Sequence, residues 1–249
     1  MDSLIFTTCG LCDIAYIEMK MEKEANKKSR IRKQMITRLI IFFLVFCIVF
    51  FLPARTLNYW EAWVYMGIIF ILATVIILYF VTHDPELLER RMKTKEKVKE
   101  QKLIIRLGWF LFLPTFIIPG FDKYYGWSQV PVYIIVISDI LVLIGYLIVF
   151  RVFRENSYAS RVVEIDPGQK VISTGPYRIV RHPMYSGILL MYGLTPLALG
   201  SYWALTGSFF LFIIIVVRIF NEEKYLEENL DGYKEYLQRT KFRIIPGIW

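Results

Sequence analysis

The chain has 249 residues, of which 56% are hydrophobic and 16% aromatic, and its mean hydropathy is +0.45. Together with long apolar runs, these values exclude a disordered chain and place the protein in the membrane class. The net charge of +8 comes without an RNA- or DNA-binding motif, so we expect the basic residues to mark loops on one side of a bilayer. The length predicts one domain without internal repeats.

Residues 1–38 end in a basic run and are expected to form a basic cytoplasmic segment. They lack the order of basic, apolar and cleavage regions that marks a signal peptide. Cys9 and Cys12 form a C-x-x-C pair, but a lone pair without a second one does not indicate a metal or redox site. Cys47 lies in an apolar run, so no disulfide framework is expected.

Residues 39–150 predict four transmembrane helices, at about 39–53, 63–81, 107–120 and 131–150. A charged cytoplasmic helix at 84–106 connects the second helix to the third. Its start is marked by Asp84 as N-cap and Pro85 as the first helical residue.

Residues 151–249 predict the functional region. A polar insert at 151–186 precedes two apolar segments, 187–200 and 203–217, each shorter than the roughly 20 residues of a full span. Since only a tight turn separates these segments, we expect a helical hairpin. Leucines and a tyrosine at helical spacing then predict an amphipathic helix at 221–240, followed by an apolar tail that docks on the membrane face or on the site.

The distribution of Lys and Arg predicts the topology. Residues 1–38 and residues 83–106 carry eight such residues each, whereas the loops at 54–60 and 121–130 carry one each. The positive-inside rule then places both termini in the cytoplasm, with about six membrane crossings.

The polar stretch at 174–187 is the strongest candidate for a binding site. Gly175-Pro176 predicts a turn, His182 is biased to an extended backbone by the proline after it, and Pro183 suits the first position of a helix. The N-terminus of that helix would attract a carboxylate or phosphate. The alternative is an interfacial belt of Arg and Tyr side chains that reach lipid headgroups.

A second group of polar residues follows the hairpin. Arg218 and Glu222 are four residues apart and share a helix face, whereas Glu223 points elsewhere. Because a hairpin returns the chain to its start, His182 and Tyr185 should lie close to Arg218 and Glu222. Arg218 at the end of a span can simply reach the interface, but charges at membrane depth are functional candidates by default.

These motifs resemble the isoprenylcysteine carboxyl methyltransferase family, whose broad pattern phospholipid methyltransferases share. The resemblance rests on Thr174-Gly-Pro-Tyr177, Arg181-His-Pro-Met-Tyr-Ser-Gly187, Glu222-Glu223 and the Tyr233-x-x-Tyr236…Pro246 tail. It covers about residues 156–249, while the first four spans are similar only in being membrane helices. It implies an all-α, polytopic membrane bundle with a cytoplasmic pocket for S-adenosyl-L-methionine.

The resemblance also implies roles for individual residues. Arg218 would be the catalytic residue that orients the acceptor, and Glu164 aligns less certainly with a cofactor-contacting position. No metal ligand is implied. The implied cofactor-binding residues are Gln169, Lys170, Val171, Ile172, Tyr177, His182, Pro183, Met184, Tyr185 and Glu222.

The expected function is direct in-line methyl transfer to a lipophilic acceptor, such as an isoprenylcysteine carboxylate, that enters from the bilayer. Such a transfer needs mainly positioning, which fits a sequence without a Ser/His/Asp arrangement or a metal cluster. Phospholipid N-methylation and S-methylation of a small thiol stay open. From other classes, we retain an NADPH-dependent sterol or steroid reductase and a non-catalytic membrane sensor. No nucleic-acid partner is expected.

Overall fold

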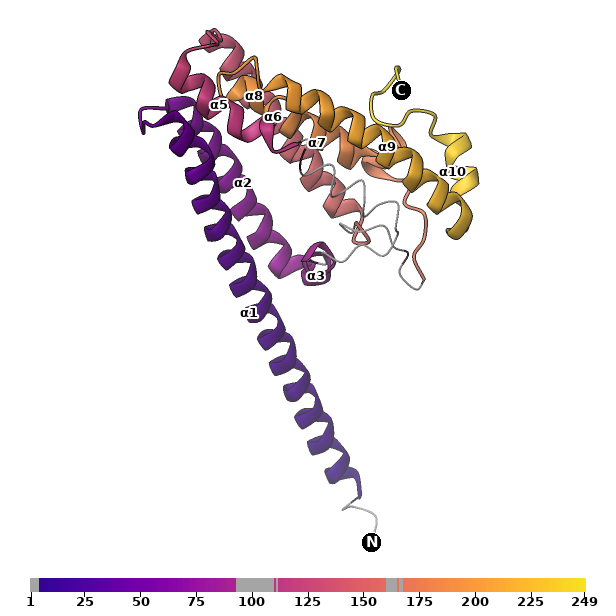
Figure 1. Cartoon of the computed structure of the whole chain (residues 1–249). Helices are drawn as coiled ribbons and strands as arrows, with labels where there is room; N and C mark the ends of the chain where they lie inside the picture. The colour runs from indigo at the N-terminus through magenta and orange to yellow at the C-terminus, as the bar shows by residue number, and fades with distance from the viewer. Residues whose placement is uncertain (1–4, 93–109, 111, 160–164, 166–167) are drawn as a thin grey trace.

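The structure is a computed structural model that describes residues 5–92, 110, 112–159, 165 and 168–249 (Figure 1). Within these residues every regular element is a helix. Four helices are long and apolar enough to cross a membrane: α1 (Ile5–Ala54), α2 (Trp60–His83), α6 (Val132–Glu155) and α9 (Leu205–Asn229). The predicted all-helical membrane bundle is therefore confirmed.

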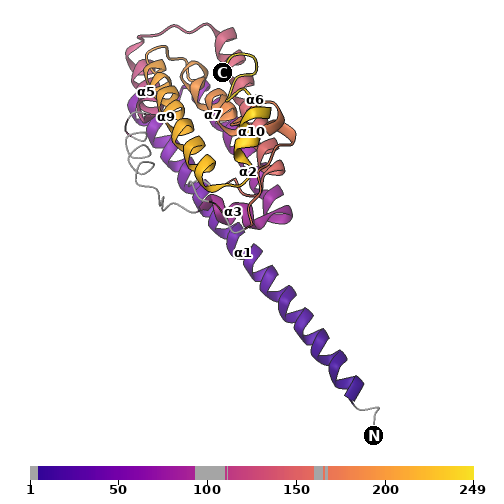
Figure 2. The same ribbon diagram turned by 90° about the vertical axis from the view of Figure 1, so that its right-hand side faces the viewer.

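Helix α1 joins the basic N-terminal segment to the first span without a break, and its N-terminal half projects away from the other helices (Figures 1 and 2). The expected separation of residues 1–38 from a helix at 39–53 is thus not seen in the secondary structure. Residues 15–38 contain neither Pro nor Gly, so no residue ends the helix where the apolar run begins.

Helix α3 (Pro85–Met92) starts as the sequence predicts. The backbone N–H of Leu87 donates a hydrogen bond of 3.0 Å to Oδ1 of Asp84, which makes Asp84 a true N-cap. Leu87 and Leu88 are buried in a cluster with Ile31 of α1. The rest of the predicted charged helix, residues 93–106, lies outside the described residues.

Helix α5 (Pro114–Tyr125) corresponds to the predicted third span, but it is shifted toward the C-terminus of that prediction. It passes through residues expected in a loop and ends at Gly126, whose φ of 66° is left-handed. The part of the prediction before Phe112 lies almost wholly outside the described residues.

Helices α7 (Pro183–Gly193), α8 (Thr195–Ala198) and α9 form the predicted hairpin. Helix α7 packs very closely on α6 where Gly145 meets Gly187. A Cβ on Gly187 would lie 2.7 Å from Cγ2 of Val149 and 2.9 Å from the carbonyl oxygen of Gly145. Two glycines therefore let these helices touch along their backbones.

The chain after the hairpin corrects the prediction of one amphipathic helix at 221–240. Helix α9 runs on to Asn229, the chain turns, and a separate short helix, α10 (Tyr233–Arg239), follows. The turn contains Gly232, whose φ of 80° is accessible to glycine at no steric cost. This reversal brings α10 back beside the end of α9 (Figure 1).

The end of the bundle away from α10 is closed by polar contacts. Asp122 is buried and accepts hydrogen bonds from the backbone N–H and Oγ of Ser128, both at 2.6 Å, and from Oγ of Ser201. Lys123 of α5 pairs with Glu61 of α2 at 3.1 Å. These contacts join α2, α5 and the turn after α8 at this end of the bundle.

Candidate functional site

A pocket opens where the loop before α7, the start of α7, the end of α9 and α10 meet. The structure brings all the residues that the sequence predicted for the site into the wall of this pocket. Those residues are Gln169, Lys170, Val171, Ile172, Tyr177, His182, Pro183, Met184, Tyr185, Arg218 and Glu222. Glu164 lies outside the described residues.

The predicted turn at Gly175 is a single 3-10 turn, η1 (Gly175–Arg178). Gly175 has a φ of 55°, and a Cβ at this position would lie 2.7 Å from the carboxylate of Glu155. The left-handed φ therefore favours glycine, whereas the Glu155 side chain could move to make room for a Cβ. The turn presents Tyr177 to the pocket, where its hydroxyl accepts a 2.9 Å hydrogen bond from Nδ2 of Asn156.

The His182–Pro183 pair forms the N-terminal boundary of α7, as predicted. His182 is the N-cap residue with φ −124° and ψ 60°, and Pro183 is the first residue of the helix. His182 is buried, and its ring lies 5.7 Å from the ring of Tyr185. Both residues line the pocket.

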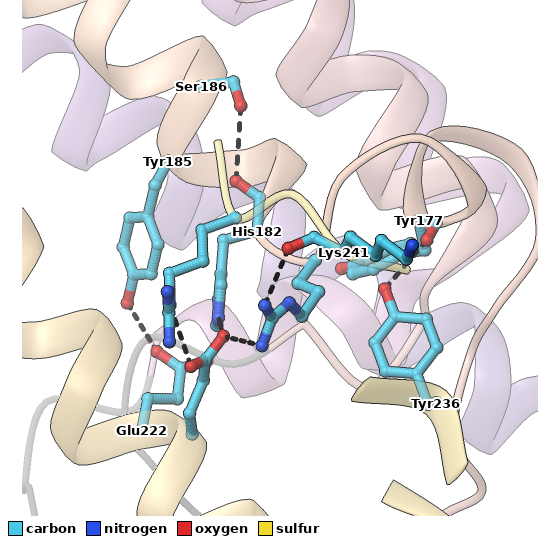
Figure 3. Close-up of polar contacts among 10 residues, drawn as sticks. Tyr177, His182, Tyr185, Ser186, Glu222, Tyr236 and Lys241 are labelled. Carbon is cyan, nitrogen blue, oxygen red and sulfur yellow. Dashed lines mark hydrogen bonds and ion pairs between the residues drawn. The ribbon is translucent and has the colours of Figure 1, made fainter. Parts of the chain in front are cut away.

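Tyr185 connects the two predicted halves of the site. Its hydroxyl donates a 2.6 Å hydrogen bond to Oε2 of Glu222 (Figure 3). The same hydroxyl accepts a 2.8 Å hydrogen bond from Nε of Arg218. The hairpin thus brings α7 against the end of α9 as the sequence predicted. Hydrogen bonds to charged groups are short and strong, so these two hydrogen bonds fix the side chains of Arg218, Tyr185 and Glu222.

Glu223 is the residue that the sequence interpretation missed. It points away from Arg218, as expected, but its buried carboxylate lies 3.0 Å from Nη1 of Arg181, 3.2 Å from Nε2 of His182 and 3.0 Å from Nε of Arg243. Two guanidinium groups and an imidazole thus surround one carboxylate. The doubled Glu222-Glu223 was the available signal, but sequence spacing did not show which partners each carboxylate has.

The C-terminal tail docks on the same site, which confirms one of the two predicted positions. The backbone N–H groups of Arg181 and His182 donate to the carbonyls of Phe242 and Arg243 at 2.9 and 2.8 Å. Ser186 Oγ donates to the carbonyl of Ile244 at 2.6 Å. The tail therefore holds the segment that carries His182 in place from outside the pocket.

Five tyrosines line the pocket: Tyr158, Tyr177, Tyr185, Tyr233 and Tyr236. Burial raises the pKa of Tyr177 to about 12, and it also raises the pKa values of Tyr233 and Tyr236. These three rings are consequently neutral at physiological pH, and their hydroxyls can donate hydrogen bonds. Tyr236 donates to the carbonyl of Tyr177 at 2.8 Å (Figure 3).

Further lining residues were not predicted for the site: Asn156, Tyr158, Ala159, Arg181, Leu226, Leu230, Tyr233 and Tyr236. The apolar spacing of Leu226, Leu230 and Tyr233 was visible in the sequence, but it indicated a helix face rather than a pocket wall. The pocket is therefore polar at the start of α7 and around Arg218 and Glu222 of α9, and it is apolar at Leu226 and Leu230.

Fold and site together define a helical membrane protein whose last helices enclose a tyrosine-rich, charged pocket at one end of the bundle. Residues 133–231, which run from α6 to the end of α9, match the model of the phospholipid methyltransferase family. This part of the chain is therefore similar to that family, as the sequence motifs predicted, and the similarity supports a membrane methyltransferase.

The chain is also similar to the solved structure of a eukaryotic intramembrane Ras methyltransferase, ICMT (isoprenylcysteine carboxyl methyltransferase). The two sequences are 17% identical, the match covers 86% of each chain, and the TM-score is 0.39. A score this low does not define a common arrangement of the helices.

Proposed function

We propose that the protein transfers a methyl group from S-adenosyl-L-methionine to a lipophilic acceptor. The observation that carries this proposal is that the predicted site residues line one pocket. At its centre, hydrogen bonds link Arg218 to Tyr185 and Tyr185 to Glu222. Bound S-adenosylmethionine supplies an activated, positively charged methyl sulfonium.

The residues of the pocket fit this cofactor. Aromatic faces attract a cation, and five tyrosines line the space. The carboxylate of Glu222 can accept hydrogen bonds from hydroxyl or ammonium groups, while the start of α7 favours a carboxylate. Residues 169–172 offer backbone groups along a third side.

Arg218 is the residue we assign to the acceptor. Its Nε is fixed by Tyr185, so its guanidinium enters the pocket in one orientation. A fixed cation can hold an anionic acceptor at the reacting position, and positioning of this kind supplies much of the rate in a displacement reaction. A carboxylate acceptor needs no base, because it is already ionised.

An isoprenylcysteine carboxylate is our first candidate for the acceptor, and a phospholipid amine is the second. The family match over residues 133–231 favours the second candidate, for which Arg218 would hold the lipid phosphate. A phospholipid ammonium must lose a proton before its nitrogen has the lone pair that attacks the methyl group, and Glu222 is a carboxylate in the pocket wall that can receive this proton.

For the topology, we propose six crossings with both termini and the pocket on the cytoplasmic side. Helix α5 with the residues before it, and α7 with α8, would add two crossings to the four long helices. The support is the concentration of Lys and Arg before α1 enters the apolar region and after α2.

Calorimetric titration of the detergent-purified protein tests the cofactor. Saturable binding of S-adenosylmethionine and of S-adenosylhomocysteine, without binding of NADPH, is the expected result. Binding of NADPH alone would replace the proposal with a reductase. If a folded sample bound none of the three, the sensor interpretation would be favoured.

A further inference from the structure

The segment of α1 at residues 27–38 carries six basic residues and no acidic residue. It lies directly before the apolar run of the helix, in which most of the large apolar side chains from Ile36 to Leu52 are exposed. The basic segment therefore lies where α1 leaves the hydrocarbon region of the bilayer.

Part of this segment is committed to the protein itself. Lys27 and Arg30 both reach Glu89 of α3, at 3.1 and 3.6 Å. Ile31, the residue after Arg30, is fully buried in a cluster with Leu87 and Leu88. These contacts hold α1 in one rotational orientation relative to α3.

The other side of the segment is exposed. Lys28, Arg32 and Lys33 are open to solvent, and the structure pairs none of them with an acidic side chain among the residues it describes. We call these three residues the basic face. Clusters of Lys and Arg next to a membrane helix attract anionic lipid headgroups.

Distance along the helix separates this face from the basic residues further out. Arg32 precedes Ile36 by four residues, which is about 6 Å along a helix. Lys20 and Lys23 lie about 20 Å or more from Ile36 by the same rise per residue. The Debye length at physiological ionic strength is about 8 Å, so Arg32 and Lys33 feel far more of the surface charge than Lys20 and Lys23 do, and Lys28, about 12 Å from Ile36, is intermediate.

The helix segment that carries the basic face is connected to the pocket by packing on its other side. The cluster that contains Ile31 and Leu87 includes Ala159, and Ala159 lines the pocket. Both features consequently lie at the same end of the bundle.

We propose that Lys28, Arg32 and Lys33 bind the phosphate groups of anionic lipids in the leaflet at the pocket end. This lipid-binding surface is separate from the methyl-transfer site, so the lipid-binding proposal does not depend on the proposed reaction. It would surround the pocket side of the protein with anionic lipid and fix its depth in the bilayer.

The test uses the full chain in a neutral detergent, titrated with dioctanoyl-phosphatidylglycerol or dioctanoyl-phosphatidylcholine. Thermal unfolding and native mass spectrometry report bound lipid. We expect phosphatidylglycerol to bind saturably and phosphatidylcholine or inorganic phosphate to have no comparable effect. At about 1 M salt, where the Debye length is about 3 Å, the preference should disappear in the wild-type protein.

The double variant R32Q/K33Q is matched by K20Q/K23Q, which makes the same charge change on exposed residues of the same helix. Each basic residue at a membrane surface contributes about fivefold to binding, so R32Q/K33Q should weaken binding of phosphatidylglycerol by at least about tenfold. K20Q/K23Q should bind as the wild type does. Equal losses in the two variants, or equal binding of the two lipids by the wild type, would overturn the proposal.

Discussion

Glu223 and Arg181 are 42 residues apart in the sequence, yet their side chains lie 3.0 Å from each other in a buried ion pair. The same carboxylate also contacts His182 and Arg243, so it joins the start of α7 to the C-terminal tail. The carboxylate is the common partner of three donors that hold one wall of the pocket.

We therefore predict that Glu223→Ala lowers the free energy of unfolding by about 3 kcal/mol, because it removes the only carboxylate that the structure pairs with the largely buried Arg181 and the partly buried Arg243 among the residues it describes. Glu227 lies one turn further along α9 and is exposed, so Glu227→Ala should change stability by less than about 0.5 kcal/mol. Chemical denaturation in detergent micelles measures both. Equal stabilities of the two variants would show that the buried network contributes little.

Arg218→Ala should separate cofactor binding from transfer. If Arg218 orients the acceptor, the variant binds S-adenosylhomocysteine within about threefold of the wild type but loses at least about a hundredfold in transfer to a prenylated cysteine or to phosphatidylethanolamine. His182→Ala is the contrasting variant, in which we expect weaker binding of S-adenosylhomocysteine. A parallel loss of binding and transfer in Arg218→Ala would remove this residue from the acceptor role.

Gly187→Ala should destabilise the contact between α6 and α7. The added methyl group would lie 2.7 Å from Val149 and 2.9 Å from the backbone of Gly145, and overpacking of this kind costs about 1–3 kcal/mol. Gly193 is in the same helix and has no atom within 4 Å of the corresponding position, so Gly193→Ala is the control. Thermal unfolding should show a lower midpoint for the first variant only.

The pH dependence of stability should reveal Tyr177. Its pKa is about 12 in the folded protein, whereas tyrosines of an unfolded chain titrate near 10. A raised pKa means that the folded state holds the proton more tightly, so this stabilisation is complete below about pH 10 and is lost between about pH 10 and 12. The unfolding midpoint should fall over that range, and it should fall less in Tyr177→Phe. An identical fall in both proteins would show that the raised pKa of Tyr177 does not contribute to the pH dependence.

The capping and turn preferences of single residues predicted much of the local backbone structure around the site. Asp84, Pro183 and Gly175 each set the backbone within a few residues, so their structures follow from the sequence around them. The contact between Tyr185 and Glu222 followed from the hairpin, since a short turn returns the chain to its start. These predictions needed no knowledge of distant partners.

Other features depend on contacts between distant segments. The partners of Glu223 come from residues 181, 182 and 243, and no spacing rule selects them. The continuity of α1 was missed for a different reason. Hydropathy locates the edge of the bilayer, whereas Pro and Gly locate the end of a helix, and the two boundaries do not coincide in this chain.

The network around Glu223 has a consequence for synthesis of the protein. Arg181 and His182 leave the ribosome about forty residues before Glu223 does, and about sixty before the backbone of Phe242 and Arg243 that binds them. During translation, two groups destined for a buried carboxylate must stay in water or at the lipid headgroups. The pocket can therefore be completed only after α9 has been inserted and the tail has folded back, which makes its assembly one of the last steps in maturation.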